Sequence, residues 1–337
     1  MTQRGLTLRL LAALLLLLLT AGVAACASDG HAAVEITPAP VASDASAAAV
    51  ELEGGSAPLV TAVDPGRPLP GFWSSAPRVS ADATIFAPVN TALAAVVMDE
   101  ASGAVLYEKD AHRALPPASL TKIATAILAA ESGRLDELVT VDVDSRVMRG
   151  STVMGLVPGD RFTLRELLHG LMMPSGNDAA LAIGRALAGS DAAFVQQMND
   201  LSRRLGLTDT SWANPHGLGG ANHYTSAYDL AILSRYYMSF PALRDVVSKR
   251  SYTAGVDRPI EMWTLNPLFG YPGVDGLKTG YTRTAGNTLV TSRVKDGHRI
   301  FVVILNDRER AGDAWALSQW AFETYRWPGT AVSAAAR

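Results

Sequence analysis

Strand-like segments lie at both ends of the patterned part of this 337-residue chain, and only helical patterns separate them. Two early segments, 92–98 and 104–107, flank the turn-forming run 99–103 and predict a hairpin. Three later segments alternate or run apolar, at 276–281, 287–294 and 299–306. Because early and late strands can pair in one sheet while helices pack outside it, this order predicts an α+β domain whose antiparallel sheet joins the N- and C-terminal segments.

The middle of the chain has helical patterning. Pro116-Pro117 introduces a helix from about Ser119 to Glu131, and Thr163 and Glu166 have the spacing of a capping box before an apolar run. Further helical patterns cover 178–188, 191–205, 226–239 and 311–325. A block of helices between the early and late strands is therefore expected.

The N-terminus has the pattern of an export signal, predicted for residues 1–25. Arg4 and Arg9 precede an uncharged apolar run that ends in small residues. The only cysteine, Cys26, follows Val23-Ala-Ala, which resembles a bacterial lipobox in which Cys26 is lipidated and becomes the mature N-terminus. Ordinary cleavage after Ala25 or Ala27, or an uncleaved anchor helix, remain as alternatives.

The domain organisation follows from where patterning begins. Residues 27–88 are rich in Ala, Ser, Pro, Gly and Asp without a sustained period, which is typical of a flexible spacer. We predict a lipobox and linker over 26–88, one folded domain over 89–328 and a tail over 329–337. Phe72-Trp73 is apolar enough to dock on the domain, which places the outer boundary of the linker within roughly ten residues of 88.

Composition excludes several classes of function. A formal net charge of −3 with 18% charged residues provides no basic field, so no nucleic-acid partner is expected. The six histidines never form His-Glu-x-x-His, and one cysteine cannot build a Cys-rich cluster. We therefore expect neither a metal nor another cofactor.

Three short elements carry the chemistry, in the order Ser119-Leu-Thr-Lys122, Ser175-Gly-Asn177 and Lys278-Thr-Gly280. Ser119 and Lys122 lie at the start of a predicted helix, where residues three apart share a face. A second Ser-x-x-Lys match at 292–295 lies in a strand pattern, where residues three apart face opposite sides, and is interpreted as structural.

A serine hydroxyl is a poor nucleophile until a base takes its proton. A lysine can be that base only when burial or nearby positive charge lowers its pKa. The apolar residues that follow Lys122 predict burial, and Lys278 could supply the second cation.

The other two elements suggest how a substrate is held. Taken alone, Pro174-Ser-Gly-Asn177 could be only a turn before a helix. Lys278 provides a fixed positive charge for a substrate carboxylate, Thr279 a hydroxyl donor, and Gly280 a place where substrate backbone can approach a sheet edge. The joint occurrence of the three elements favours a catalytic interpretation.

Four stretches closely resemble the low-molecular-mass penicillin-binding proteins, the D-alanyl-D-alanine carboxypeptidases: 115–126, 174–180, 214–218 together with 225–227 and Asp229, and 274–280. The resemblance covers roughly 90–325 and makes the folded domain a serine DD-peptidase catalytic domain. It implies a five-stranded antiparallel sheet flanked by helices on both faces, with the active site between the sheet and a helical subdomain.

The resemblance also implies roles for the three elements. Ser119 attacks the carbonyl of the penultimate D-alanine, Lys122 accepts its proton, Ser175 passes a proton to the departing amine, and Asn177 positions Lys122 and the substrate amide. The substrates would be peptidoglycan stem peptides ending in D-alanyl-D-alanine, and β-lactams would trap the same ester.

The sheet-edge element would bind the end of the substrate. By the resemblance, Lys278 and Thr279 hold the terminal carboxylate, and Gly280 leaves room beside them. The backbone N–H groups of Ser119 and Tyr281 form the oxyanion hole, which commonly dominates acyl transfer.

Two polar clusters are interpreted as structural. His216 lies in the loop Asn214-Pro-His-Gly and invites a triad interpretation, but a triad depends on geometry that sequence does not give. Ser226 and Asp229 fit a capping box better than a catalytic pair.

Three rival functions remain open. Short relatives include endopeptidases that cut D-alanyl cross-links. A class A β-lactamase needs a carboxylate downstream of the Ser-x-Asn element, whereas Glu166 lies upstream of it. A β-lactam sensor that acylates and stalls is the non-enzyme rival.

The larger carboxypeptidases carry a C-terminal β-rich domain and an amphipathic helix that anchors them to the membrane. The lipid at Cys26 would replace that anchor.

Overall fold

The computed structural model describes residues 75–328 apart from 82, 84–85 and 149. The predicted export signal, Cys26, the N-terminal part of the predicted linker and the 329–337 tail lie outside these residues. No helix within the described range is long and apolar enough to cross a membrane.

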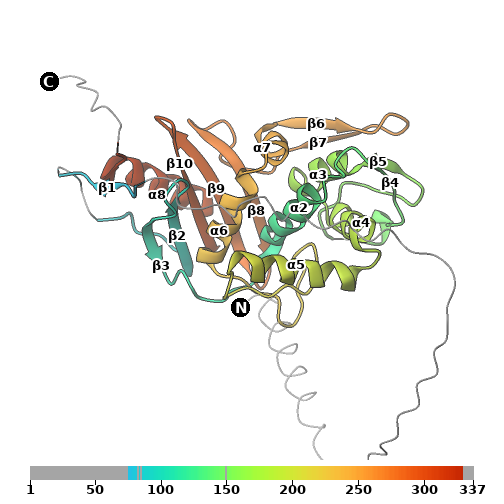
Figure 1. Ribbon diagram of the computed structural model, residues 1–337, viewed down its shortest axis with the longest axis horizontal. Coiled ribbons are helices and arrows are strands. Elements are labelled where there is room, and N and C mark those ends of the chain that lie inside the picture. Colours follow the sequence, from blue (N-terminus) through green and yellow to red (C-terminus); the bar gives the residue numbers. More distant parts are fainter. Residues whose placement is uncertain (1–74, 82, 84–85, 149, 329–337) are drawn as a thin grey trace, which may run out of the picture. The chain divides into compact units, whose positions relative to one another are not determined.

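A five-stranded antiparallel sheet is the centre of the fold (Figure 1). Its order is β3-β2-β10-β9-β8, so the early hairpin pairs with the last of the late strands. The strands are β2 (Ala94–Asp99), β3 (Val105–Lys109), β8 (Val274–Thr282), β9 (Gly286–Lys295) and β10 (His298–Asp307). The predicted α+β fold, with a sheet that joins both ends of the domain, is confirmed.

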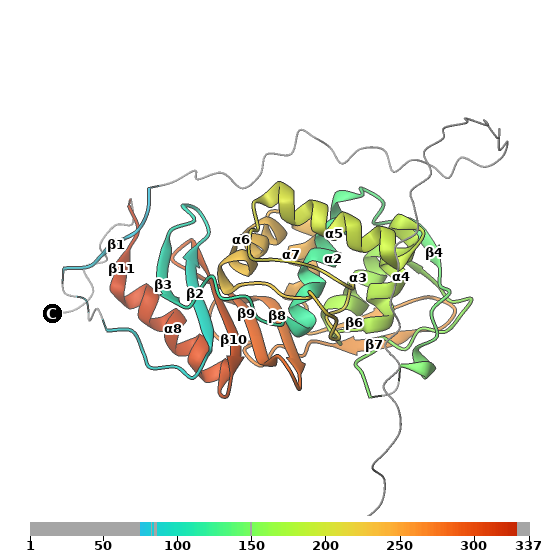
Figure 2. The same ribbon diagram turned by 90° about the horizontal axis from the view of Figure 1, so that it is seen from below.

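Alternation along the strands divides the core into two layers. On β2, Ala94, Val96 and Met98 face one layer, while Ala95 and Val97 face the other. All five are completely buried, because helices cover both faces of the sheet. Figure 2 shows α8 (Arg310–Thr324) on one side of the sheet and the helical block on the other.

The helical block supplies the second half of the domain. Its central helix, α2, packs against α3, α4, α5 and α6, and eight of its ten residues are buried. The helices are α2 (Lys122–Glu131), α3 (Leu164–Met172), α4 (Asn177–Ala188), α5 (Asp191–Leu205), α6 (Ala227–Met238) and α7 (Pro241–Ser248). The capping box predicted for Thr163 and Glu166 is present at the start of α3.

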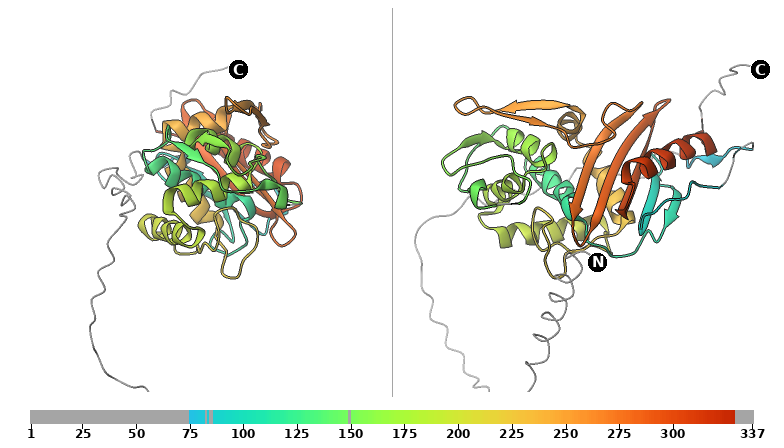
Figure 3. Two further views of the ribbon diagram at one scale, coloured as in Figure 1. Left: turned by 90° about the vertical axis from the view of Figure 1, so that its right-hand side faces the viewer. Right: turned by 180° about the vertical axis from the view of Figure 1, so that it is seen from behind.

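Short elements complete the domain and were not predicted. A hairpin formed by β6 (Ser251–Ala254) and β7 (Ile260–Trp263) lies beside α3 and away from the β2–β3 edge of the sheet (Figure 3). The others are β1 (Arg78–Val79), β4 (Leu138–Thr140), β5 (Arg161–Thr163), β11 (Tyr325–Arg326) and the 3₁₀ turns η1 (Ala118–Thr121) and η2 (Ser145–Val147).

The pairing of β1 with β11 changes the N-terminal boundary of the folded part. Arg78 lies opposite Arg326 and Val79 opposite Tyr325. Ordered pairing therefore begins inside the segment predicted as linker, ahead of the predicted domain start at 89. The two-residue strand has no periodicity that sequence could reveal.

Candidate active site

Ser119 lies in the 3₁₀ turn η1, which connects the sheet to α2. The sheet holds the residue before the turn, since Thr288 on β9 donates a hydrogen bond to the carbonyl of Pro117 (3.2 Å). Ala118 has a left-handed backbone (φ 51°), which is costly for a residue with a Cβ. Backbone conformations of this kind cluster at functional sites and here present Ser119 between the sheet and the helices.

Lys122 begins α2 and is completely buried. Its Nζ lies 2.9 Å from Ser119 Oγ, 2.7 Å from Asn177 Oδ1 and 2.8 Å from the backbone oxygen of His216. The two carbonyl oxygens can only accept hydrogen bonds. A neutral amine gives its two protons to them and directs its lone pair at the Ser119 hydroxyl, which is the arrangement of a general base.

Electrostatics favour that neutral form. Burial, followed by the charge of Lys278, holds the pKa of Lys122 well below its ordinary value, and the Asp178 carboxylate opposes this only partly. The predicted desolvated setting and the predicted second cation are therefore both present.

Ser175 and Asn177 enter the site from the turn before α4. Ser175 has a left-handed backbone (φ 64°), and its buried Oγ has no hydrogen-bond partner among the described residues. Thr152 stabilises this turn through two hydrogen bonds. Its hydroxyl donates to the Ser175 carbonyl (2.7 Å), and its carbonyl accepts from the Asn177 N–H (2.9 Å). A buried hydroxyl without a partner is available to a substrate group.

Asp178 fixes the segment that carries Thr152. Its carboxylate is buried and accepts four backbone N–H bonds at 2.7–2.9 Å, from Met154, Gly155, Leu156 and Ala179. The Ser-Gly-Asn turn is thus locked by a charge that sequence reasoning did not single out.

The third element forms the open edge of the sheet on β8. Gly280 lies so close to η1 that a Cβ there would be 3.0 Å from the backbone nitrogen of Ser119 and 2.4 Å from Thr288 Oγ1. A side chain does not fit here without displacing its neighbours, and glycine lets β8 lie close to the Ser119 nitrogen. Tyr281, whose N–H was predicted for the oxyanion hole, follows on the same strand with an exposed side chain.

Lys278 departs from the prediction of a fixed charge. Its side chain is buried and donates to the Thr279 carbonyl (2.9 Å). Burial, and secondarily the charge of Arg310, lowers its pKa to about 7. Its charge in the free protein is therefore titratable near neutrality, and a substrate carboxylate would stabilise the charged form.

Arg310 and the His216 carbonyl are parts of the site that sequence reasoning missed. Arg310 Nη1 donates to the Gly280 carbonyl across 2.6 Å and so fixes the sheet edge from α8. The carbonyl of His216 belongs to a loop whose side chain had drawn attention instead. A backbone acceptor carries no residue-type signal, and Arg310 has no local motif.

The structural interpretations of the neighbouring polar residues need one correction. The His216 ring accepts a hydrogen bond from the Leu218 N–H of its own loop, and burial lowers its pKa to about 4. Ser226 caps α6, but Asp229 does not complete a capping box. The Asp229 carboxylate instead accepts from the Asp209 N–H (2.8 Å) and the Thr210 hydroxyl (2.7 Å), because that loop packs over the helix start.

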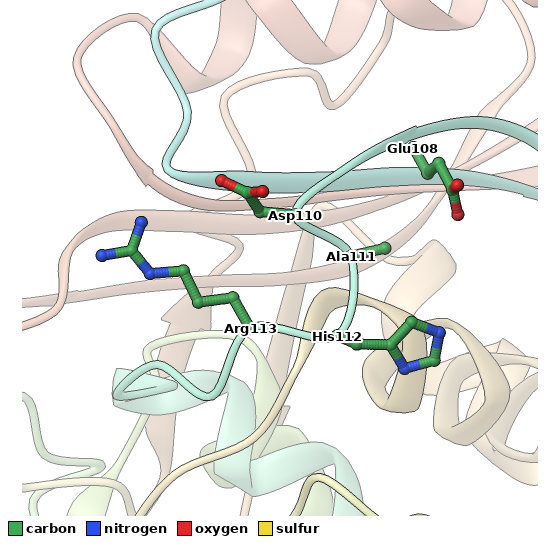
Figure 4. Close-up of a pocket in the computed structure, with 5 residues that line it drawn as sticks. All are labelled: Glu108, Asp110, Ala111, His112 and Arg113. Carbon is green, nitrogen blue, oxygen red and sulfur yellow. The ribbon is translucent and has the colours of Figure 1, made fainter.

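A hollow at the end of β3 is lined by Glu108, Asp110, Ala111, His112 and Arg113 (Figure 4). None of the predicted site residues lines it. In the described part of the chain, no group of three or more His, Cys, Asp or Glu side chains could hold a metal ion.

Comparisons with known proteins agree with this geometry. The family model described as D-alanyl-D-alanine carboxypeptidase matches residues 81–309, which include every predicted site residue except Cys26. D-alanyl-D-alanine carboxypeptidase DacF of Bacillus subtilis is 34% identical over 245 residues, covering 69% of this chain and 63% of that protein. D-alanyl-D-alanine carboxypeptidase DacC of Escherichia coli is 35% identical over 264 residues, covering 73% and 65%.

A solved structure supports the fold as well. The crystal structure of penicillin binding protein 6B from Escherichia coli has a TM-score of 0.65 at 34% identity, and the match covers 72% of this chain and 81% of that one. The chain spans less than two thirds of the length of the two carboxypeptidases named above.

Proposed function

Because this chain belongs to the D-alanyl-D-alanine carboxypeptidase family, we propose that it is a serine-type enzyme that removes the terminal D-alanine from peptidoglycan stem peptides. The observation that carries the proposal is the environment of Lys122. Its amine lies 2.9 Å from Ser119 Oγ, and its other two partners are carbonyl oxygens. Such an amine can take the serine proton without a histidine.

Acylation of Ser119 is the first half of the reaction. Ser119 Oγ forms a bond to the carbonyl carbon of the penultimate D-alanine while its proton passes to Lys122. The developing oxyanion accepts hydrogen bonds from the N–H groups of Ser119 and Tyr281. The C–N bond then breaks, and the proton on Lys122 reaches the leaving amine through Ser175, whose hydroxyl has no partner among the described residues.

Hydrolysis completes the cycle. Water attacks the acyl-enzyme ester while Lys122 takes a proton from it. The bond between the acyl carbon and Ser119 Oγ then breaks, Lys122 returns the proton to Oγ, and the shortened peptide leaves. A β-lactam forms the same ester but has no separate leaving group, since its amine stays tethered. Benzylpenicillin is therefore expected to acylate Ser119 and to inhibit the enzyme.

The carboxylate of the terminal D-alanine would bind at the β8 edge. Lys278 provides the charge, Thr279 a hydroxyl, and Gly280 the open backbone beside Ser119. Binding an anion there raises the pKa of Lys278, so a substrate with a free carboxylate promotes its own recognition. A substrate with a free carboxylate next to the scissile bond, as at the end of a stem peptide, fits this edge.

The test uses two substrates side by side. The protein is incubated with a stem pentapeptide and with a cross-linked muropeptide dimer, and mass spectrometry follows free D-alanine and monomer. Release of D-alanine from the pentapeptide alone supports the proposal, whereas cleavage of the dimer alone indicates an endopeptidase. Full activity in a Ser119→Ala variant would refute the mechanism.

We further propose that the protein works outside the cytoplasm, tethered by a lipid on Cys26. The support is the apolar N-terminal run that ends at Val23-Ala-Ala-Cys26. Globomycin treatment of cells should shift the protein to a larger precursor on a gel. A Cys26→Ala variant should lose membrane attachment, and retained attachment would contradict the lipid anchor.

A further inference from the structure

A buried chain of hydrogen bonds ends on the carbonyl that precedes the nucleophile. Thr121 Oγ1 donates to the Ala118 oxygen across 2.8 Å, and His223 Nε2 lies 2.8 Å from the same hydroxyl. Thr121 is completely buried, and His223 is 6% exposed. The proposed reaction uses neither side chain. Thr121 lies within the first sequence element, but no role was predicted for it there.

The direction of each hydrogen bond is fixed by the donors. A backbone N–H can only donate, so His223 Nδ1 accepts from Ala213 (2.9 Å). The single proton of the Thr121 hydroxyl goes to the Ala118 oxygen. The contact between Thr121 and His223 is therefore donated by His223 Nε2–H, which defines the neutral tautomer of the ring.

The surroundings keep that tautomer in place. Burial lowers the pKa of His223 to about 4, so the ring is neutral at physiological pH. A protonated ring would turn Nδ1 into a donor facing the Ala213 N–H. The chain of donors thus has one arrangement at neutral pH.

This series of hydrogen bonds ends at the peptide unit that is proposed to form part of the oxyanion hole. The Ala118 carbonyl and the Ser119 N–H belong to one planar peptide group. A hydrogen bond accepted by the carbonyl polarises the group and strengthens its N–H as a donor. It also restricts rotation of that peptide group, whose nitrogen lies 3.0 Å from where a Cβ of Gly280 on β8 would be.

The backbone around Ala118 is strained and closely packed. Ala118 is held at φ 51°, and Gly217 (φ 91°) approaches so closely that a Cβ there would lie 1.8 Å from the Ala118 oxygen. A strained residue persists only where its surroundings determine it. Here the surroundings are the Thr121 hydroxyl and a glycine.

We propose that Thr121 and His223 are positioning residues that orient and polarise the Ala118–Ser119 peptide, so that the Ser119 N–H stabilises the oxyanion during acylation. This inference rests on the proposed function, because an oxyanion forms only if Ser119 attacks a carbonyl. Neither residue touches the substrate. Their effect is on the transition state rather than on substrate binding.

Thr121→Val removes the hydroxyl at nearly constant shape, and Thr125→Val is its matched control. Thr125 lies one turn later on α2 and donates to the Pro215 carbonyl (2.7 Å), so it makes the same kind of buried bond without reaching the Ala118 peptide. Benzylpenicillin acylation of Thr121→Val should slow about tenfold, less than the loss of a whole oxyanion donor. The Thr125 bond holds the loop whose His216 carbonyl contacts Lys122, so this control is judged by an unchanged carbonyl stretch of the acyl-enzyme ester rather than by its acylation rate.

Two substitutions of His223 separate the effect of where the hydrogen-bond donor lies from the effect of changing the ring to a smaller side chain. In His223→Gln the amide nitrogen replaces Nε2 and can still donate to Thr121, whereas the shorter side chain of His223→Asn reaches only the place of Nδ1. We expect His223→Gln to acylate within about threefold of the unmodified protein and His223→Asn to slow about tenfold. If Thr121→Val does not fold, the comparison of His223→Gln with His223→Asn still tests whether the donor at Nε2 affects acylation.

The infrared carbonyl stretch of the acyl-enzyme ester provides a readout that a merely structural role would not move. A weaker oxyanion donor leaves this stretch at higher frequency, so it should rise in Thr121→Val and His223→Asn but not in Thr125→Val. Equal acylation rates and equal frequencies across these variants would overturn the inference while leaving the proposed function standing. Absence of any ester on Ser119 of the unmodified protein would overturn both.

Discussion

Lys122 and Lys278 are both buried in one site, and the charge of Lys278 lowers the pKa of Lys122. Two buried cations that repel each other are unfavourable, so at neutral pH the site favours a state with one of them neutral. Lys122 has partners that suit a neutral amine, while Lys278 faces the edge where an anion would bind. This difference fits the proposed roles, in which Lys122 is the base and Lys278 binds the substrate carboxylate.

Replacement of Lys122 tests the base directly. Lys122→Met keeps the length of the side chain but removes the amine, and acylation by benzylpenicillin should fall by about 10²- to 10⁴-fold, the usual contribution of general base catalysis. Lys122→Arg should fall as far, because a guanidinium stays protonated. Rates are followed by stopped-flow fluorescence. Substantial activity in Lys122→Arg would mean that positive charge, not basicity, is what the position supplies.

The pH dependence of kcat/KM should report Lys278. Its pKa is lowered from 10.5 to about 7, so its positive charge is present below about pH 7 and is lost as pH rises through that value. The rate with a carboxylate substrate should therefore decline on the alkaline side of neutrality. In Lys278→Arg the charge persists, and the alkaline decline should move to higher pH. An unchanged decline in that variant would assign it to another group.

Gly280→Ala should block the site without unfolding the protein. The added Cβ would meet Thr288 Oγ1 at 2.4 Å and the Ser119 nitrogen at 3.0 Å, so β8 must move away from the oxyanion N–H. We expect at least a 100-fold loss of acylation, similar to the loss of one oxyanion donor.

Gly312→Ala is the matched control for Gly280→Ala. It lies in α8 with no atom within 4 Å of the added Cβ, so it should keep full activity and gain about 0.5–1 kcal/mol of stability. Acylation rates and thermal melts measured on both variants check the pair. Normal acylation in Gly280→Ala would contradict the close approach of β8 to Ser119.

Asp178→Asn should destabilise the helical block. The amide can accept from only some of the four N–H groups that now share the carboxylate, and its own NH₂ would face the others. We expect a loss of about 2–4 kcal/mol in the free energy of unfolding from urea titration. Asp200→Asn, which removes only an exposed ion pair with Arg203, should change it by less than about 0.5 kcal/mol. A loss no larger than that of the control would show that Asp178 does not hold the Ser-Gly-Asn turn.

Sequence periodicity was sufficient to predict the longer helices and strands whose apolar residues follow a clear spacing. The strands β8, β9 and β10 and the helices α2 to α6 were predicted within a few residues, because their apolar spacing differs clearly between period 2 and period 3.6. Ser119 and Lys122 could be paired from helical spacing alone. Their partners could not, since Asn177 and Lys278 reach Lys122 only through the tertiary fold.

The hairpin β6–β7 and α7 had weak signals. Each strand has only four residues, and apart from Ala254 and Met262 its side chains are at least partly exposed, so their alternation is faint. Helix α7 has eight residues and starts at Pro241 directly after α6, so it reads as a continuation or a loop.

The roles of single groups were the hardest to predict. The His216 carbonyl is a backbone atom, the chain from His223 to Ala118 depends on a tautomer, and the pKa of Lys278 depends on burial and on Arg310. Asp229 has the spacing of a capping box, yet it binds the neighbouring loop instead. Local spacing predicts only local partners.

The protonation state of Lys122 is the most direct test of the whole account. In protein labelled with ¹³C and ¹⁵N lysine, the Nζ signal of Lys122 can be assigned by its absence in Lys122→Arg and followed with pH. We predict the chemical shift of a neutral amine at pH 7, with protonation only as the pH is lowered well below the ordinary lysine value of 10.5. An ammonium signal at pH 7 that titrates near 10.5 would contradict the proposed activation of Ser119.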